Sequence, residues 1–173
     1  REPGGTPGAE SIRDLALKGA ADRWSPVTET LLMYAARRDH IERVIGPALA
    51  RGAWVICDRF ADSTRAYQGG AGGVDERLIT ALETHVLGDV KPDLTLVFDL
   101  PAEVGLERAH VRAGSEMRFE SKGVAFHERL REAFRRIAAA EPERCAVIDA
   151  TGDMDAVEAA VWAAVSERLA IHG

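Results

Sequence analysis

Polar side chains follow directly on the apolar residues 54–57, where a buried strand would end. Asp58 and Arg59 come first, and a second group of hydroxyl, phenol and amide side chains follows at Ser63, Thr64, Tyr67 and Gln68. Helical spacing would place this second group along one side of about a turn and a half of helix. Ligands of parallel α/β sheets bind beyond the carboxyl ends of the strands, so this mixture predicts a site for a small polar ligand.

Arginines surround the same predicted site. They fall near expected strand ends, or on the helices that lead to them, at Arg1, Arg13, Arg37 and Arg59. A guanidinium fork binds phosphate oxygens in pairs, and neutral donors and acceptors can bind a base edge or a sugar hydroxyl. We therefore expect a phosphorylated, base-bearing small molecule as ligand. Taken alone, Asp58 could equally be a helix cap and Arg59 a solvated side chain.

The composition is that of one globular domain with a sizeable core: 173 residues, of which 46% are hydrophobic and 29% charged. A net charge of −6 argues against a nucleic-acid coat or a basic membrane surface. The sequence has neither an apolar run of roughly 20 residues nor an opening signal peptide. We expect a cytoplasmic protein with no nucleic-acid or membrane partner.

The cysteines and histidines do not predict a metal centre. Cys57 and Cys145 lie inside apolar runs, where free buried thiols are more common than a disulfide or a metal pair. The histidines show no ligand spacing and are expected on helix surfaces, at His40, His85, His110, His127 and His172.

Apolar periodicity and capping residues predict alternating strands and helices. Ser25 and Pro26 form the N-cap and first position of a long helix, which Gly46 and Pro47 interrupt before Gly52 ends it. Strands are expected at 53–57, 94–100 and 145–148, and further helices at 9–18, 75–87, 102–111, 124–140 and 153–171. This order predicts an α/β domain, a parallel sheet with helices on both faces. The charged loop 112–122 is a candidate lid.

Several motifs, in order along nearly the whole chain, resemble those of bacterial thymidylate kinases. They are REPGGT at 1–6, GAESIRDL at 8–15, YAARRDHI at 34–41, DRFADSTRAYQGG at 58–70, PDLTLVFDLPAEVGLER at 92–108 and IDAT at 148–151. The resemblance implies a P-loop nucleoside monophosphate kinase fold that transfers the γ-phosphoryl group of MgATP to dTMP, giving dTDP. It also implies a homodimer, for which the long helix from Val27 offers a surface.

The resemblance also implies roles for individual residues. Arg59 would hold the acceptor phosphate, and Asp58 would act through the Mg²⁺ shell or orient Arg59. Arg37 would hydrogen-bond the thymine ring. Tyr67 would lie against the deoxyribose, where a ribose 2′-hydroxyl would clash. The base edge would be closed by Ser63, Thr64 and Gln68, and the acceptor pocket bordered by Glu2, Pro3 and Arg13.

Basic residues in and before the predicted lid would serve ATP and the transferred phosphoryl group. In part of the family a basic P-loop residue supplies the catalytic charge, and in another part lid arginines do; Arg112 and Arg118 favour the second arrangement. Arg108 would lie against the adenine, with Ala150 and Thr151 opposite. A solvated basic helix end is the alternative for all three arginines.

Three features depart from the family pattern. Met33 stands where a Phe usually stacks on thymine, so a related (deoxy)nucleoside monophosphate kinase for another base is an alternative. Met117 replaces the usual lid Asp ahead of Arg118. The sequence contains no G-x-x-x-x-G-K-[ST] loop. We therefore expect residues 1–173 to lack the N-terminal strand and P-loop of the kinase domain and to be inactive alone. A noncatalytic nucleotide-binding remnant is a further alternative.

Overall fold

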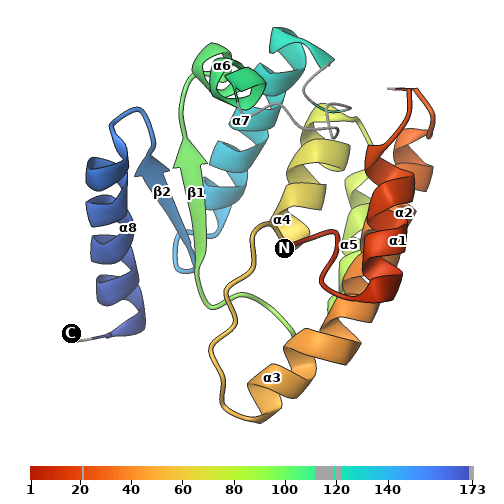
Figure 1. Cartoon of the computed structure of the whole chain (residues 1–173), viewed down its shortest axis with the longest axis horizontal. Coiled ribbons are helices and arrows are strands. Elements are labelled where there is room, and N and C mark those ends of the chain that lie inside the picture. The colour runs from red at the N-terminus through yellow and green to blue at the C-terminus, as the bar shows by residue number, and fades with distance from the viewer. Residues whose placement is uncertain (21, 112–118, 120–121, 172–173) are drawn as a thin grey trace.

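Capping side chains set where the first two helices begin. The computed structural model describes residues 1–20, 22–111, 119 and 122–171. Helix α1, Pro7–Leu17, starts after Thr6, whose side chain accepts a hydrogen bond from the amide of Ala9. Helix α2, Pro26–His40, starts after Ser25, which accepts from the amide of Thr28. The predicted start of the long helix is therefore confirmed, and α1 packs along α2 (Figure 1).

The long helix is interrupted near Pro47, as the sequence predicts. A π-helical segment η1, Ile41–Ile45, follows α2 and leads into the short helix α3, Gly46–Ala50. Proline has no amide hydrogen, and its ring clashes with the carbonyl four residues before it. The wider π-helical turn relieves this conflict without breaking the rod of helix.

Two of the three predicted strands form the sheet, and the third prediction is wrong. Strands β1, Thr95–Asp99, and β2, Cys145–Asp149, pair in parallel from Thr95 opposite Cys145 to Asp99 opposite Asp149. Residues 53–57 have no regular secondary structure, and the Ile56 side chain is 98% exposed. Apolar composition predicts burial, but a strand also needs a hydrogen-bonded neighbour, and within the described residues β1 and β2 pair only with each other.

Helices cover the sheet and connect its strands. Helices α6, Ala102–Val111, and α7, Val124–Ala140, lie between β1 and β2 in the chain, and α7 packs against both strands. Helix α8, Met154–Leu169, begins after the capping residue Asp153 and packs along β2 (Figure 1). None of the helices in the described ranges is long and apolar enough to cross a membrane.

The polar motif after residue 58 forms two joined segments instead of one regular helix. Helix α4, Ala61–Thr64, continues directly into the π-helix η2, Arg65–Ala71. Because η2 is not α-helical, the predicted single face divides: Thr64 and Gln68 are buried with partners on α2, whereas Tyr67 contacts phenylalanines of α7. A Cβ at Gly70 would overlap the methyl group of Ala133, so glycine permits η2 to lie close against α7.

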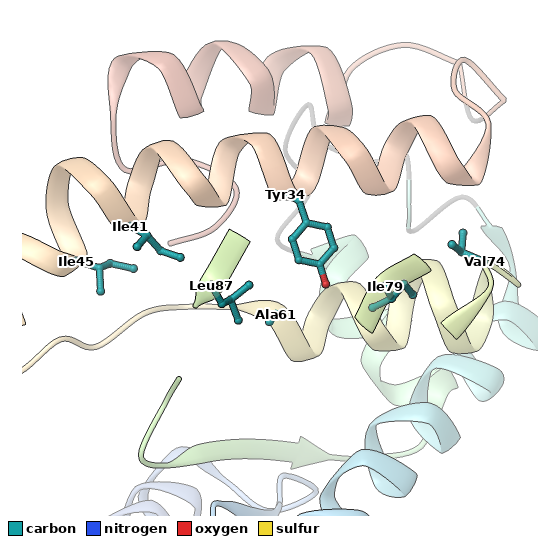
Figure 2. Close-up of a cluster of buried hydrophobic side chains, with 7 residues drawn as sticks. All are labelled: Tyr34, Ile41, Ile45, Ala61, Val74, Ile79 and Leu87. Carbon is teal, nitrogen blue, oxygen red and sulfur yellow. The ribbon is translucent and has the colours of Figure 1, made fainter. Parts of the chain in front are cut away.

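The main apolar core lies between α2, η1, α4 and α5, Glu76–Leu87, which Asp75 caps. Figure 2 shows Tyr34 projecting from α2 toward Ala61 and Ile79, with Ile41 and Ile45 farther along the same rod. A second cluster packs η2 against α7 through Ala66, Phe126 and Leu130. The first cluster includes Ala61 of α4 and the second includes Ala66 of η2, so packing holds both parts of the joined segment in place.

Candidate nucleotide site

Arg37 lies at the centre of a buried polar network. Its side chain is 3% exposed, and Nε donates to Glu2 Oε2 over 2.6 Å while Nη1 donates to Thr64 Oγ1 over 3.2 Å. The guanidinium lies over the rings of Tyr34 and Phe60, at 5.0 and 5.3 Å. Its Nη2 makes no hydrogen bond to the residues that the structure describes. This arrangement fixes the plane of the guanidinium and leaves one donor group for a ligand.

Glu2 joins the N-terminal loop to this network. Its backbone amide donates to the carbonyl of Asp58 at 2.8 Å, and its Oε1 lies 3.0 Å from Nδ1 of His40. The prediction of a surface histidine at position 40 is wrong, because His40 is 5% exposed. Its ring turns inward to complete the hydrogen bonding of a buried carboxylate, which would otherwise be costly. The loop is also held by Arg13, whose Nη1 donates to the carbonyl of Pro3 over 2.8 Å.

A second buried pair links α2 to η2. Gln68 Nε2 donates to Glu29 Oε1 over 2.7 Å, and both side chains are buried. Met33, one turn along α2 from Glu29, is also buried. The structure therefore brings together the predicted base-binding side chains of Arg37, Met33, Thr64 and Gln68.

Arg59 and Tyr67 form a separate, more exposed part of the site. Arg59 has a φ of 67°, and its guanidinium lies 5.0 Å from the centre of the Tyr67 ring. A left-handed arginine costs about 1–2 kcal/mol, and backbone strain of this kind clusters at functional sites. Tyr67 also contacts Phe119 edge-on at 5.2 Å. Asp58, which precedes Arg59 in the sequence, is exposed, and Ser63, one helical turn before Tyr67, is half-buried.

The predicted adenine-side residues also meet. Arg108 Nη1 donates to the carbonyl of Ala150 over 2.8 Å, and Nη2 lies 3.4 Å from the carbonyl of Thr151. Thr151 in turn is held by Asp149, whose Oδ1 accepts from both its amide and its hydroxyl. Arg112 and Arg118 lie outside the described residues.

Sequence reasoning missed a charged cluster on the other side of α4. Arg144 donates to both carboxylate oxygens of Asp62, over 2.7 and 2.8 Å, and Thr95 donates to the same carboxylate over 3.2 Å. Hydrogen bonds from Arg144, aided by Arg65, lower the pKa of Glu141 to about 2. Asp62 belongs to the polar motif 58–70, but it lines a cavity between α5 and α7. The sequence motif alone does not show that Asp62 faces away from the candidate nucleotide site.

Glu29 was missed for a different reason. It stands in the first turn of α2, where an acidic residue is explained by the helix dipole alone. Only the fold reveals that its carboxylate meets Gln68, which is 39 residues away in the chain. Tyr34, on the same helix, donates to Glu83 Oε1 over 3.3 Å, and burial raises its pKa.

Asp58 and a cluster around Glu2 offer possible ligand atoms to a cation. The exposed Asp58 carboxylate is the hard oxygen ligand that Mg²⁺ prefers. Among the described residues, possible ligand atoms of Glu2, His40 and Cys57 also lie within 4.8 Å of one another. In that cluster Glu2 already bonds Arg37 and His40, so proximity alone assigns no metal to it.

These features define a parallel α/β protein whose polar site suits an anionic, base-bearing ligand. A family model described as thymidylate kinase matches residues 1–161. The chain is 67% identical to the thymidylate kinase of Caulobacter vibrioides, covering 99% of this chain and 82% of that protein. It is 55% identical to the thymidylate kinase of Nitrobacter hamburgensis, covering 99% and 75%.

A solved structure agrees. The crystal structure of thymidylate kinase from Ehrlichia chaffeensis superposes with a TM-score of 0.73 at 35% identity, covering 96% of this chain and 78% of that one. This chain belongs to the thymidylate kinase family.

Proposed function

We propose that this protein is a dTMP kinase that uses the Arg37 network to hold thymine and Arg59 to hold the acceptor phosphate. Membership of the thymidylate kinase family assigns it the transfer of the γ-phosphoryl group of ATP to dTMP, giving dTDP. The observation that supports the site most strongly is the buried Arg37, with fixed hydrogen bonds to Glu2 and Thr64 and a remaining Nη2 donor. Thymine presents a carbonyl acceptor, O4, that such a donor fits.

Arg59 and Asp58 would act at the acceptor phosphate. The left-handed backbone at Arg59 directs its guanidinium over the Tyr67 ring, within the same part of the site as Asp58. Phosphoryl transfer depends mainly on alignment and on neutralising spread charge, which are tasks for a preset arginine. A bound Mg²⁺ would neutralise phosphate oxygens, and Asp58 would hold it directly or through water.

The donor side and the lid complete the proposed enzyme. Arg108 is anchored on the carbonyls of Ala150 and Thr151, so one face of its guanidinium could stack on adenine. Residues 112–122 would close over ATP and bring Arg112 and Arg118 to the transferred phosphoryl group. The whole would be one P-loop nucleoside monophosphate kinase domain with helices on both sheet faces, working in the cytoplasm as a homodimer.

The second candidate is a kinase for another pyrimidine or purine monophosphate. Its motivation is Met33, which is buried on α2 in the position expected to stack on the base. A thioether can contact an aromatic base, but it selects ring type less strictly than a second ring would.

Turnover of a panel of acceptors tests the proposal. With MgATP as donor, and in a chain that carries a strand and P-loop ahead of Arg1, dTMP should give the highest kcat/KM among dTMP, dUMP, dCMP and dAMP. A higher kcat/KM for any other acceptor would favour the second candidate, and nucleotide binding without turnover of any acceptor would favour a noncatalytic remnant.

A further inference from the structure

Glu29 determines which end of the Gln68 amide faces the site. Gln68 is 3% and Glu29 4% exposed, and Nε2 of Gln68 donates to Oε1 of Glu29 over 2.7 Å. An ionised carboxylate only accepts hydrogen bonds, so the amide nitrogen and not the carbonyl oxygen must turn toward it. Oε1 of Gln68 accepts no hydrogen bond from the described residues. It is therefore the group that Gln68 can offer to a ligand.

Arg37 and Gln68 together then offer a ligand one donor group and one acceptor group. Arg37 can only donate, through Nη2, and Gln68 is restricted to accepting through Oε1. Thymine and uracil carry the matching pattern, a carbonyl acceptor at position 4 next to an N–H donor at position 3. Cytosine carries the opposite one, an amino donor at position 4 next to a bare nitrogen acceptor at position 3.

We propose that Glu29 is a positioning residue that sets base specificity. Because Glu29 binds Nε2 of Gln68, Oε1 of Gln68 faces the base. There it accepts a hydrogen bond from N3–H of a thymine or uracil ring and repels the bare N3 of a cytosine ring. The inference rests on the proposed function, because it takes Gln68 as a base contact. Rotating the amide in the native protein would oppose two oxygens in a buried place, which is strongly unfavourable.

The Glu29→Gln variant removes the constraint on the orientation of the Gln68 amide while keeping the shape of the side chain at position 29. A glutamine at position 29 can either accept from Gln68 or donate to it, so both orientations of the Gln68 amide become accessible. The probes are dTMP and 5-methyl-dCMP, which share the methyl group and sugar and differ only at ring positions 3 and 4. We expect the ratio of their dissociation constants, measured by calorimetry, to narrow on the order of tenfold.

Glu83→Gln is the matched control. Glu83 contacts α2 through Tyr34 and is also partly buried, but it does not meet Gln68. This variant should keep the ratio of the two dissociation constants within about twofold of that of the unaltered protein. A merely structural link between α2 and η2 would change stability in Glu29→Gln without changing that ratio.

The swapped pair, Glu29→Gln with Gln68→Glu, decides the question even if Glu29→Gln does not fold. It keeps one carboxylate and one amide in contact, and the acceptor-only group now faces the base. We expect it to restore the preference for dTMP over 5-methyl-dCMP. A swapped pair that binds dTMP but no longer prefers it, or a folded Glu29→Gln protein with an unchanged ratio, overturns the inference while leaving the proposed function intact. Absence of dTMP preference in the unaltered protein would instead defeat the proposed function.

Discussion

At the scale of single residues, the site depends on groups whose hydrogen bonds are already fixed before a ligand binds. Arg37 is hydrogen-bonded to Glu2 and Thr64, and Glu2 is also hydrogen-bonded to His40. Preset geometry reduces the entropy that binding would otherwise lose. It also means that changing one member disturbs its neighbours.

Replacing Arg37 by lysine should weaken dTMP binding although the charge remains. Lysine has no planar fork, so it cannot donate to Glu2 and Thr64 and also to the base. We expect the dissociation constant for dTMP to rise by an amount equivalent to about 1–3 kcal/mol. Arg38→Lys is the control, because Arg38 is exposed on the same helix and pairs with Glu42. Equal effects at both positions would argue against base recognition by Arg37.

Replacing Tyr67 by leucine should narrow the preference for dTMP over ribothymidine monophosphate. In the proposed site the aromatic ring occupies the space that a ribose 2′-hydroxyl would need. Tyr67→Phe keeps the ring and its contact with Phe119, so it should keep the preference. The ratio of kcat/KM for the two acceptors measures this effect, and an unchanged ratio in Tyr67→Leu would exclude a steric role.

At the scale of elements, an ion pair ties α7 to the end of β1. Arg131 donates to both oxygens of Asp99, over 2.7 and 3.0 Å, and this hydrogen bonding holds the pKa of Asp99 below its ordinary value of 3.8. Since the folded pKa is depressed, the contribution to stability is present above about pH 3.8 and is lost as the pH falls through the folded value.

Asp99→Asn should therefore lower the free energy of unfolding at pH 7 by about 1–2 kcal/mol, with a smaller loss well below pH 3.8. Urea unfolding at both pH values measures the difference. Asp93→Asn, at an exposed position before β1, should change little at either pH. A loss for Asp99→Asn that does not depend on pH would show that the pairing with Arg131 is not its cause.

The proposed lid makes a kinetic prediction. An arginine that reaches the phosphoryl group only on closure stabilises the transition state more than bound dTMP. In the full-length enzyme, which includes the P-loop segment, Arg118→Ala and Arg112→Ala should each lower kcat about tenfold or more and leave the dTMP dissociation constant within about threefold. If both variants retain full kcat, the catalytic charge comes from elsewhere.

At the scale of the whole molecule, local sequence signals predicted helices well and non-local contacts poorly. Ser25 with Pro26 marked the start of α2, and α7 has the predicted bounds 124–140, because caps and periodicity act over a few residues. The failures at 53–57, His40 and Glu29 have a common cause. Strand pairing and the inward turn of a polar side chain depend on residues about 35 or more positions away, which no local pattern reports.

An exposed apolar surface on α1 and α2 supports the proposed homodimer. Leu15, Val27 and Leu31 are 45%, 45% and 48% exposed. Light scattering should give a molecular mass twice that of one protomer. The Leu31→Glu variant should have the mass of a single protomer, because dimerisation would bury a charge at the interface. The mass of a single protomer for the unaltered protein would contradict the proposed homodimer.

Crystallographic determination of the dTMP complex tests the central claim most directly. We expect thymine O4 within about 3 Å of Arg37, thymine N3 at the same distance from Oε1 of Gln68, and the 5′-phosphate at Arg59. Thymine bound away from α2, for example in the cavity between α5 and α7, or a base whose position 3 faces away from Gln68, would contradict it.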